Sequence, residues 1–497
     1  MDDRALAPKR EVDAREHRQL FLDDEAIASR VGLTRKMHRP DLQGPVLEPD
    51  SAAGEVALQS RSVPQWNSEK GYWEWWYWGG WSCEPYGQWA TTTTQLCQLA
   101  ISTDGLDWEK PDVGRHEWKG SKHNNILVDP EHGSRAFYHV VRDERDPDPA
   151  KRYKGLLNSN GRKPAFSADG VDWEVVEDSD IVSSDESHFF YDDLQNQFVA
   201  LVKRGTGWGR SVFLATTEDL ITWQEHGIVL HADQQDWDNR WPRVKQVVDD
   251  PDYLSPPLVD NENYMAETYQ MAAMTYEGLY VGFPGLFNPA GAIPPPHMNH
   301  TGINQAELAM SRDLKRWRRL CNREVFIGVQ PWDGVSYDTA QTLLCGSPQL
   351  HGDEIRIYYN ACRFRGHKEL HDEKHHPYFE ATSALSLATL RRDGFVSLHA
   401  DASGELLTQP MRFEGADLYL NADAAGGDIQ VEVLHADTLK PIGALTRANS
   451  ESIKSDDLAH QVSWSGVDHP GSVMAESGPV RLRFHVKAAE LYAFWMA

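Results

Sequence analysis

Cysteine pairs, basic charge and long apolar runs are all scarce in this sequence, and each shortage excludes a class of protein. The five cysteines form no CxxC pair, which argues against both a disulfide framework and a cysteine zinc site. The 49 Lys and Arg against 75 Asp and Glu give a net charge of -26, so a polyphosphate or an anionic membrane surface would be repelled. We therefore expect neither nucleic acid nor a membrane as a partner.

Targeting segments and several catalytic motifs are also missing. No stretch approaches a membrane span, and residues 1–20 are charged throughout, without the apolar core of a secretion signal. We expect a cytoplasmic protein, or a secreted one if a signal has been removed. The sequence contains no GxSxG, no Walker-type loop and no GxGxxG between a strand and a helix, which sets aside the serine-nucleophile and phosphate-loop classes.

A repeated hairpin motif is what the sequence does contain. The stretch LAISTDGLDWEKP at 99–111 returns as AFSADGVDWEVV at 165–176, LATTEDLITWQEH at 214–226 and LAMSRDLKRWRRL at 308–320. An Asp side chain can accept a hydrogen bond from the backbone two residues further on. We therefore predict turns at Asp104, Asp169, Asp219 and Asp313, with Trp108, Trp173, Trp223 and Trp317 packing over a neighbouring sheet. A degenerate fifth copy at 387–400 has Phe395 in place of the tryptophan.

The spacing of these hairpins predicts the fold class. Five copies, with other β-like runs between them, suggest five sheets of about four strands, the architecture of a β-propeller. After Ser403-Gly404 the chain changes to short alternating strands with Gly-Gly and Asp turns, which suit a two-sheet sandwich. We expect an all-β chain with an N-terminal tail (1–18), a five-bladed β-propeller catalytic domain (19–404) and a C-terminal β-sandwich (405–497). Insertions at 229–266 and 284–305 are predicted to be loops that narrow the central funnel.

Carboxylates near the strand starts are the candidate catalytic groups, because a propeller gathers the first strand of every blade around one axis. Asp23 and Asp24 follow an apolar pair, and Asp185 and His188 come just before or within an aromatic run. Glu267 lies within an apolar run, surroundings that favour a protonated carboxylic acid and suit a proton donor. Turn acids and surface loops are the alternative interpretations for the first two groups.

Basic and aromatic residues near these acids are candidates for substrate binding. Arg61 and Arg210 stand near strand starts and could hold hydroxyls or a carboxylate in two hydrogen bonds. The run GYWEWWYWGGW at 71–81, which includes Trp75, is either packing between blades or a stacking wall for sugar rings. His38, in KMHRP, is a further candidate for a pocket wall.

Two groups of histidines raise the question of a metal: His297 with His300, and a second group of His367, His371, His375 and His376. Neither group is on a predicted helix with carboxylate support, so we expect loop histidines and no metal site. We expect no cofactor. A structural calcium or other ion in the funnel is left open, because its ligands would be scattered in the sequence.

The chain resembles the five-bladed propeller glycoside hydrolases, the group that contains families 32, 43, 68 and 117, and more closely bacterial proteins labelled family-32-like. The resemblance is carried by LFLDDEAIASRVGLTRKMHRP, the repeated hairpins, YEGLY at 276–280, Trp332-Asp333, and the C-terminal stretches LTQPMRFEGADLYLNADAAGGDIQVEVL and PVRLRFHVKAAELYAF. It implies that Asp24 is the first-blade acid, Asp185 a second acid that orients or tunes, and Glu267 the proton donor. Trp332 and Asp333 join the expected substrate-binding residues. Fructan specificity is not implied, because the opening lacks a WMNDPNG-like motif.

The resulting hypothesis is a glycoside hydrolase that cleaves an oligosaccharide or polysaccharide with paired carboxylates and acts from the chain end. Two alternatives stay open. One is a sialidase-like exo-glycosidase that uses Arg residues and a Tyr/Glu pair, for which Glu267 and Tyr269 are close in sequence. The other is a non-catalytic carbohydrate-binding propeller. A homo-oligomer is left open as well.

Overall fold

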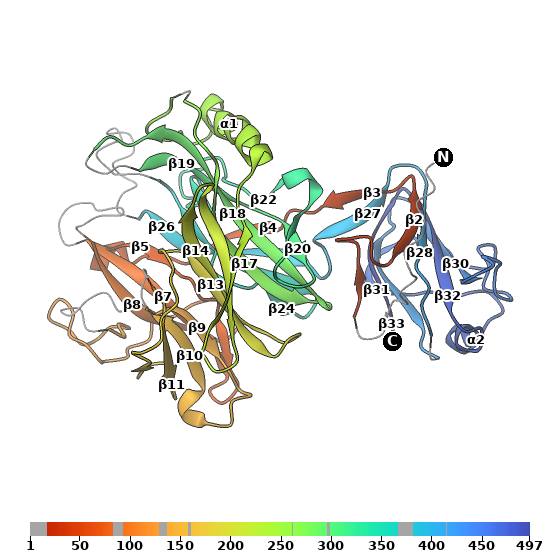
Figure 1. Cartoon of the computed structure of the whole chain (residues 1–497), viewed down its shortest axis with the longest axis horizontal. Coiled ribbons are helices and arrows are strands. Elements are labelled where there is room, and N and C mark those ends of the chain that lie inside the picture. The colour runs from red at the N-terminus through yellow and green to blue at the C-terminus, as the bar shows by residue number, and fades with distance from the viewer. Residues whose placement is uncertain are drawn as a thin grey trace.

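The computed structural model describes residues 17–82, 93–128, 137–157, 161–260, 262–295, 299–365, 381–413 and 415–497. Strands dominate these residues, and the all-β prediction is confirmed. Figure 1 shows a larger body and a smaller body side by side, the smaller one built mainly from the C-terminal strands. The larger body positions the candidate site.

The strands of the larger body form five antiparallel units. Two of them are separate four-stranded sheets, and single parallel contacts, Asn304 with Gln341 and Ser383 with Ala57, join the other three into one sheet. In chain order the units contain β5 (Glu55–Gln59), β6 (Gln65–Asn67), β7 (Tyr72–Ser82) and β8 (Thr93–Ser102); β9 (Phe137–Arg142), β10 (Tyr153–Leu157), β11 (Lys163–Ser167) and β12 (Glu174–Val175); β13 (Ser187–Asp192), β14 (Gln197–Thr206), β15 (Gly209–Thr217) and β16 (Gln224–Leu230); β17 (Glu267–Tyr276), β18 (Leu279–Ala292), β19 (His300–Glu307), β20 (Ala309–Ser311), β21 (Arg318–Arg319) and β22 (Val325–Ile327); and β23 (Gln341–Leu344), β24 (Gln349–His351), β25 (Glu354–Cys362) and β26 (Ser383–Arg391). These units suit the predicted propeller, while the blade count itself stays a prediction.

The last unit is completed by a strand from the other end of the chain. Strand β4 (Asp41–Leu47) pairs antiparallel with β26, from Leu47 opposite Leu385 to Asp41 opposite Thr389. Strand β4 precedes β5 of the first unit in the chain and pairs with β26 of the last unit, so it connects the first and last units of the larger body. Strand β26 therefore has a hydrogen-bonded partner on each side, β25 and β4, and does not form an unpaired sheet edge.

The smaller body consists of two sheets to which N-terminal strands also belong. One sheet contains β1 (Gln19–Leu20), β3 (Thr34–Met37), β27 (Val396–Ala400), β29 (Leu418–Asp423), β31 (Asp456–Gln461) and β33 (Ala489–Met496), and the other contains β2 (Ile27–Val31), β28 (Gly404–Thr408), β30 (Asp428–His435) and β32 (Val480–Lys487). This pairing differs from the predicted division, which assigned residues 19–37 to the propeller. Strands β1, β2 and β3 instead pair with β33, β28 and β27.

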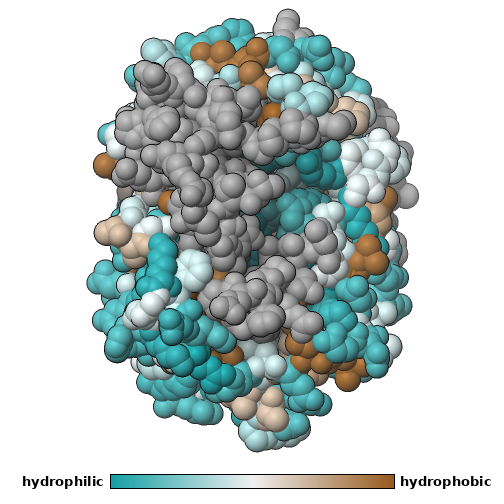
Figure 2. Space-filling view, turned by 90° about the vertical axis from the view of Figure 1, so that its left-hand side faces the viewer, coloured by the Kyte–Doolittle hydropathy of each residue, from teal (hydrophilic) through white to brown (hydrophobic). Residues whose placement is uncertain are grey.

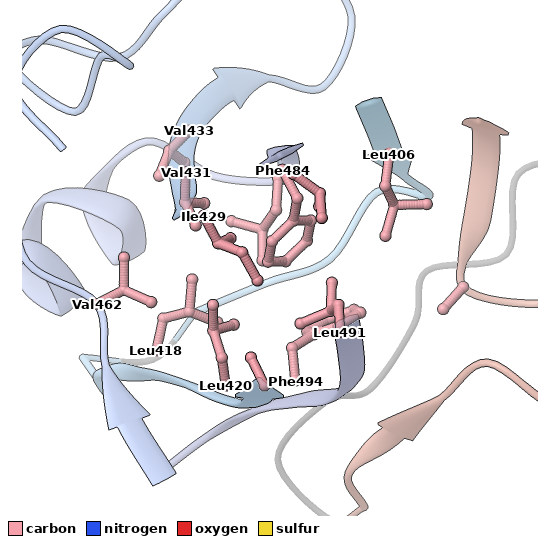
Figure 3. Packing of buried hydrophobic residues seen from close by; sticks show 14 of the residues in the cluster. Leu406, Leu418, Leu420, Ile429, Val431, Val433, Val462, Phe484, Leu491 and Phe494 are labelled. Carbon is pink, nitrogen blue, oxygen red and sulfur yellow. The ribbon is translucent and has the colours of Figure 1, made fainter. Parts of the chain in front are cut away.

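The two sheets of the smaller body enclose a continuous apolar core. Figure 3 shows inward-pointing side chains from both sheets, among them Leu420 and Leu491 facing Ile429 and Phe484. All four of these side chains are fully buried. Burial of this kind stabilises the body by about 1.5–3 kcal/mol for each large apolar side chain.

The four predicted Asp turns are confirmed. Asp104 Oδ1 accepts hydrogen bonds from the backbone N–H groups of Leu106 at 2.8 Å and Asp107 at 3.0 Å. The same pair of bonds recurs at Asp169, Asp219 and Asp313. The following tryptophans lie over neighbouring strands, two of them directly on glycines: Trp173 on Gly155 and Trp317 on Gly282. In each of these four hairpins, an Asp side chain stabilises the turn and a tryptophan ring packs against a neighbouring strand.

The fifth, degenerate copy has a different role. Asp393 is fully buried and binds Arg18, the Tyr276 hydroxyl at 2.6 Å and the Asn421 side chain at 3.0 Å. The strand that follows it, β27, belongs to the smaller body. This turn thus joins the end of β17 to the C-terminal sheets.

The two predicted loop insertions contain regular structure. Helix α1 (Gln234–Asp249) lies within 229–266, and Asp233 and Asp236 form its N-terminal capping box. Most of the described residues in 284–305 are strand rather than loop, because β18 extends to Ala292 and β19 begins at His300. In the described ranges the other helical segments are α2 (Pro470–Glu476) and short 3-10 turns at Ser51–Ala53, Pro149–Lys151 and Cys321–Arg323. Among the described residues, no helix has the length and apolarity needed to cross a membrane.

Candidate functional site

Asp185 and Glu267 stand at the starts of two adjacent units and are linked through one aromatic ring. Asp185 precedes β13 and pairs with Lys203 Nζ at 2.6 Å. That ammonium lies 3.8 Å from the centre of the Tyr269 ring, and the guanidinium of Arg210 lies 5.3 Å from the same centre. Glu267, the first residue of β17, binds Arg210. The structure therefore brings three predicted site residues, Asp185, Arg210 and Glu267, to one location.

A β-bulge presents Tyr269 to this cluster. Thr268 pairs with Leu286 and Gln270 pairs with Gly285, so Tyr269 is the extra residue of β17. Bulges redirect side chains and are common next to active sites. The tyrosine ring packs edge-on against Phe287 at 6.1 Å, and its hydroxyl has no hydrogen-bond partner among the residues that the structure describes.

The surroundings of Glu267 are polar, contrary to the sequence-based expectation of an apolar site. Its carboxylate binds the Arg210 guanidinium and accepts the Arg210 backbone N–H at 3.1 Å. Only 18% of the side chain is exposed. The apolar residues around Glu267 in the sequence mostly face the core of the unit.

Asp185 is held as an anion. Burial raises the pKa of its carboxyl, but the nearby ammonium of Lys203 and the charge of Arg61 outweigh this and lower the pKa to about 2. The Lys203 side chain in this ion pair is only 2% exposed, so its ammonium has little contact with water. Asp185 therefore carries a negative charge at every pH at which the protein would normally work.

Trp208 is a further candidate for this site, and the sequence did not predict it. It occupies the two-residue turn between β14 and β15, whose last pair is Thr206 with Gly209. The ring is 44% exposed and stacks on His231 at 4.3 Å. The adjacent Gly209 touches Glu267. The signal in the sequence was a tryptophan between two glycines, because a large apolar ring at a hairpin tip has no core to enter.

Arg61 and His188 are buried, and their polar atoms bind groups inside the protein. Arg61 is buried and paired with Glu186, and it donates to Gln59 Oε1 at 3.0 Å. His188 is buried, and its Nε2 lies 2.9 Å from the Ala273 carbonyl oxygen. Burial lowers the pKa of His188 to about 4, so the ring is neutral at pH 7.

Both residues also line a cavity of about 590 Å³ further along the same strands. Its walls include Gln65, Met274, Thr275 and Ser347. Thr275 lies eight residues along β17 from Glu267, which corresponds to roughly 25 Å in a strand. The cavity is thus a second location, separate from Glu267.

The structure does not bring Asp24 or His38 to the cluster. Asp24 lies between β1 and β2 of the smaller body, with its side chain 59% exposed and bonded to Arg35. His38 bonds Ser397 Oγ at 2.9 Å and lies 3.1 Å from Glu490, a residue of β33. Their placement follows from the pairing of β1, β2 and β3 with C-terminal strands.

Three further predicted substrate-binding residues have structural contacts. Trp75 is fully buried, with a tilted contact to Trp108 and an edge-on contact to Tyr358, so packing rather than a stacking wall explains its place in the aromatic run. Trp332 lies against the guanidinium of Arg363 at 5.2 Å. Asp333 accepts backbone N–H bonds from Val335 and Ser336 within its own turn. None of these contacts reaches Glu267.

The described part of the chain holds no group of three or more His, Cys, Asp or Glu side chains arranged to bind a metal. Of the histidines singled out in the sequence, His300 is described and packs edge-on against Tyr264 at 4.8 Å. The others lie outside the described residues: His297, His367, His371, His375 and His376.

Figure 2 shows the end of the larger body that faces away from the smaller one, and hydrophilic residues line a hollow in this face.

Comparison with known proteins finds no matching family model and no matching curated protein. Among solved structures, an N-acetylgalactosamine deacetylase from F. plautii in complex with blood group B trisaccharide is 13% identical, with a TM-score of 0.42, over 73% of this chain and 97% of that one. A β-1,2-mannobiose phosphorylase from Listeria innocua is 10% identical, with a TM-score of 0.41, over 73% and 97%. The catalytic domain of a GH62 α-L-arabinofuranosidase from Coprinopsis cinerea is 11% identical, with a TM-score of 0.39, over 72% and 98%. At these TM-scores the likeness assigns neither a family nor an activity.

Proposed function

We propose that this chain is a carbohydrate-active enzyme, a glycoside hydrolase that uses Glu267 and Asp185 as paired carboxylates on an oligosaccharide or polysaccharide. The observation that carries the proposal is the contact between Glu267 and Gly209, because Gly209 directly follows the exposed Trp208 in the chain. An exposed indole can stack on the apolar face of a sugar ring. A carboxylate next to that platform can then exchange a proton with the glycosidic oxygen.

The two carboxylates suit different roles. Asp185, with a pKa of about 2, cannot donate a proton near neutral pH. It can stabilise the positive charge that develops on the sugar ring, or accept a proton from the attacking water. Glu267 is then the proton carrier, as the resemblance to propeller hydrolases implies. Proton donation requires Glu267 to exchange its bond with Arg210 for one with the substrate oxygen, and Arg210 is 30% exposed and has room to turn away.

Exo action stays a prediction. The expected loop at 284–305 does not support it, because the described residues of that range are mainly strand. The supporting observation that remains is helix α1, which packs beside β18.

The test compares three single variants on a panel of aryl glycosides and plant, algal and microbial oligosaccharides. Glu267→Gln and Asp185→Asn are each expected to lower kcat by about 10²–10⁴-fold, the usual contribution of a general acid or base. Asp24→Asn is the matched control, because it removes a carboxylate that the sequence favoured and the structure places elsewhere; its kcat should stay within twofold of the parent.

Two outcomes would contradict the proposal. Loss of activity in Asp24→Asn alone would move the chemistry away from the Tyr269 cluster. Carbohydrate binding without turnover by the parent protein, with unchanged affinity in Glu267→Gln, would favour the non-catalytic carbohydrate-binding alternative.

A further inference from the structure

Arg365 is a buried guanidinium without an acidic partner among the residues that the structure describes. It follows β25, is 6% exposed, and donates from Nη1 to Gln341 Oε1 at 3.2 Å. Its Nε is buried and has no hydrogen-bond partner within the described ranges. An isolated buried charge is costly unless a counter-charge or several hydrogen bonds compensate it. Within the described residues, Arg365 therefore has no anion that compensates its buried charge.

This guanidinium belongs to the cluster around Tyr269. It lies 5.0 Å from the centre of the Tyr269 ring and 3.9 Å from that of Phe287. Arg210 lies 5.3 Å and 5.8 Å from the same two centres, and Lys203 Nζ lies 3.8 Å from the first. Three cations thus lie against one aromatic pair, and the Tyr269 hydroxyl has no hydrogen-bond partner among the described residues.

The charges of the cluster do not cancel. Lys203 and Arg210 are neutralised by Asp185 and Glu267, which leaves the charge of Arg365. His300 is close enough to interact electrostatically with Glu267, Arg210, Arg365 and Asp260, but burial lowers its pKa, so it adds no charge at pH 7. Asp260 also interacts with the charge of Arg240. The five groups Lys203, Arg210, Arg365, Asp185 and Glu267 together carry one excess positive charge, in a chain whose net charge is -26.

We propose that Arg365 binds the carboxylate of an acidic sugar, so that the substrate of this site is a uronic-acid-type or other carboxylated glycan. The proposal rests on the proposed function for the location of the reacting bond. A guanidinium can hold a carboxylate through two parallel hydrogen bonds, and Gln341 fixes one edge of the Arg365 plane. A carboxylate supplies one negative charge, which matches the single excess positive charge, whereas a phosphate group carries about -1.5 to -2 at pH 7.

Equilibrium binding to matched sugar pairs tests this inference without requiring turnover. Titration calorimetry would compare methyl glucuronide with methyl glucoside, and methyl galacturonide with methyl galactoside, and would include inorganic phosphate as a separate ligand. In at least one pair the acidic sugar is expected to bind at least 10-fold more tightly than its neutral partner. Arg365→Gln should abolish this preference.

Two further variants control for charge and folding. Arg316→Gln removes the same charge from a side chain that is 89% exposed and remote from the cluster, so the preference should be retained. Arg365→Lys keeps the charge but loses the planar fork. If Arg365→Gln fails to fold, Arg365→Lys should still bind the acidic sugar several-fold more weakly than the parent.

The outcomes separate this inference from the proposed function. Equal affinity for acidic and neutral sugars, or a preference that survives Arg365→Gln, would overturn the inference and leave hydrolysis untouched. Tight phosphate binding that depends on Arg365, with no preference for acidic sugars, would overturn the carboxylate assignment. A protein that prefers acidic sugars through Arg365 but cleaves none would support the inference and overturn the hydrolase.

Discussion

Gly209 packs directly against Glu267: a Cβ atom added at residue 209 would lie 2.4 Å from a carboxylate oxygen, Glu267 Oε1. The glycine also has a φ of +77°, a conformation that residues with a side chain rarely adopt. The position is therefore restricted twice, by its backbone and by the carboxylate beside it. Glu267 keeps its present orientation because residue 209 has no side chain.

Gly209→Ala is expected to displace the Glu267 carboxylate from Arg210. A catalytic group misplaced by about 1 Å can lower the rate about 100-fold, and we expect a loss of kcat of that order. Gly205→Ala is the matched control, because Gly205 lies on the partner strand of the same hairpin and an added Cβ would meet nothing within 4 Å. Equal activities of the two variants would show that the position of Glu267 does not matter.

Trp208→Ala is expected to weaken oligosaccharide binding while leaving the chemical step in place. Loss of a stacking ring worth about 0.5–1.5 kcal/mol corresponds to a rise in KM of up to about 10-fold, with kcat changed less than KM. Trp66→Ala serves as the control. Trp66 is 43% exposed, almost the same as Trp208 at 44%, but it packs at a tilt against Trp73 in the first unit. A similar rise in KM for both variants would mean that general surface effects are being measured.

His188 is expected to make the protein less stable in mild acid. Burial lowers its pKa from 6.5 to about 4, so the unfolded chain takes up a proton at a pH where the folded chain does not. The contribution of His188 to the free energy of unfolding is fully present above pH 6.5 and falls as the pH drops from 6.5 towards 4. The free energy of unfolding decreases by about 3 kcal/mol over that range. Urea unfolding at several pH values would measure this slope.

The slope should be smaller in His188→Gln, once its own stability at pH 7 is taken as the reference. His123→Gln should leave it unchanged, because the His123 side chain is 89% exposed. An identical slope in the parent and in His188→Gln would assign the acid sensitivity to other groups, with the buried His139 as the next candidate.

Glu307→Gln is expected to destabilise the contact between α1 and the fourth unit. Glu307 is fully buried and accepts hydrogen bonds from Arg243 of α1 and from Arg319. Removing one member of a buried ionic group typically costs about 3–5 kcal/mol, because the remaining charges lose their partner. Thermal and urea denaturation would measure the change.

Asp249→Asn on the same helix is the comparison for Glu307→Gln. Asp249 pairs with Lys245 in an exposed i, i+4 ion pair, and such pairs contribute about 0.3–0.5 kcal/mol. Similar losses in the two variants would mean that burial does not govern the strength of these ion pairs.

The fold was predictable where short-range chemistry decides it. The hairpin at Asp104 and Trp108 follows from hydrogen bonds between residues two or three apart, so the motif alone specified it. Helix α1 was missed, although Asp233 and Asp236 form a capping box, because its apolar residues are few and Pro242 interrupts the pattern. For the candidate site, the sequence predicted Asp185, Arg210 and Glu267 near strand starts, and the structure places them together, while their roles stay predictions. Trp208 and Arg365 were not predicted, since their proposed roles depend on exposure and on partners that only the tertiary structure shows.

By itself, the sequence determined the class of the chain, the four Asp turns and the acids near the strand starts, because these depend on composition and on neighbours along the chain. Only the tertiary structure decided that residues 19–37 pair with C-terminal strands, which carries Asp24 and His38 away from the cluster. It also decided that Trp75 is buried while Trp208 is exposed. Strand pairing and burial join residues hundreds of positions apart, and no local pattern records which partners they will have.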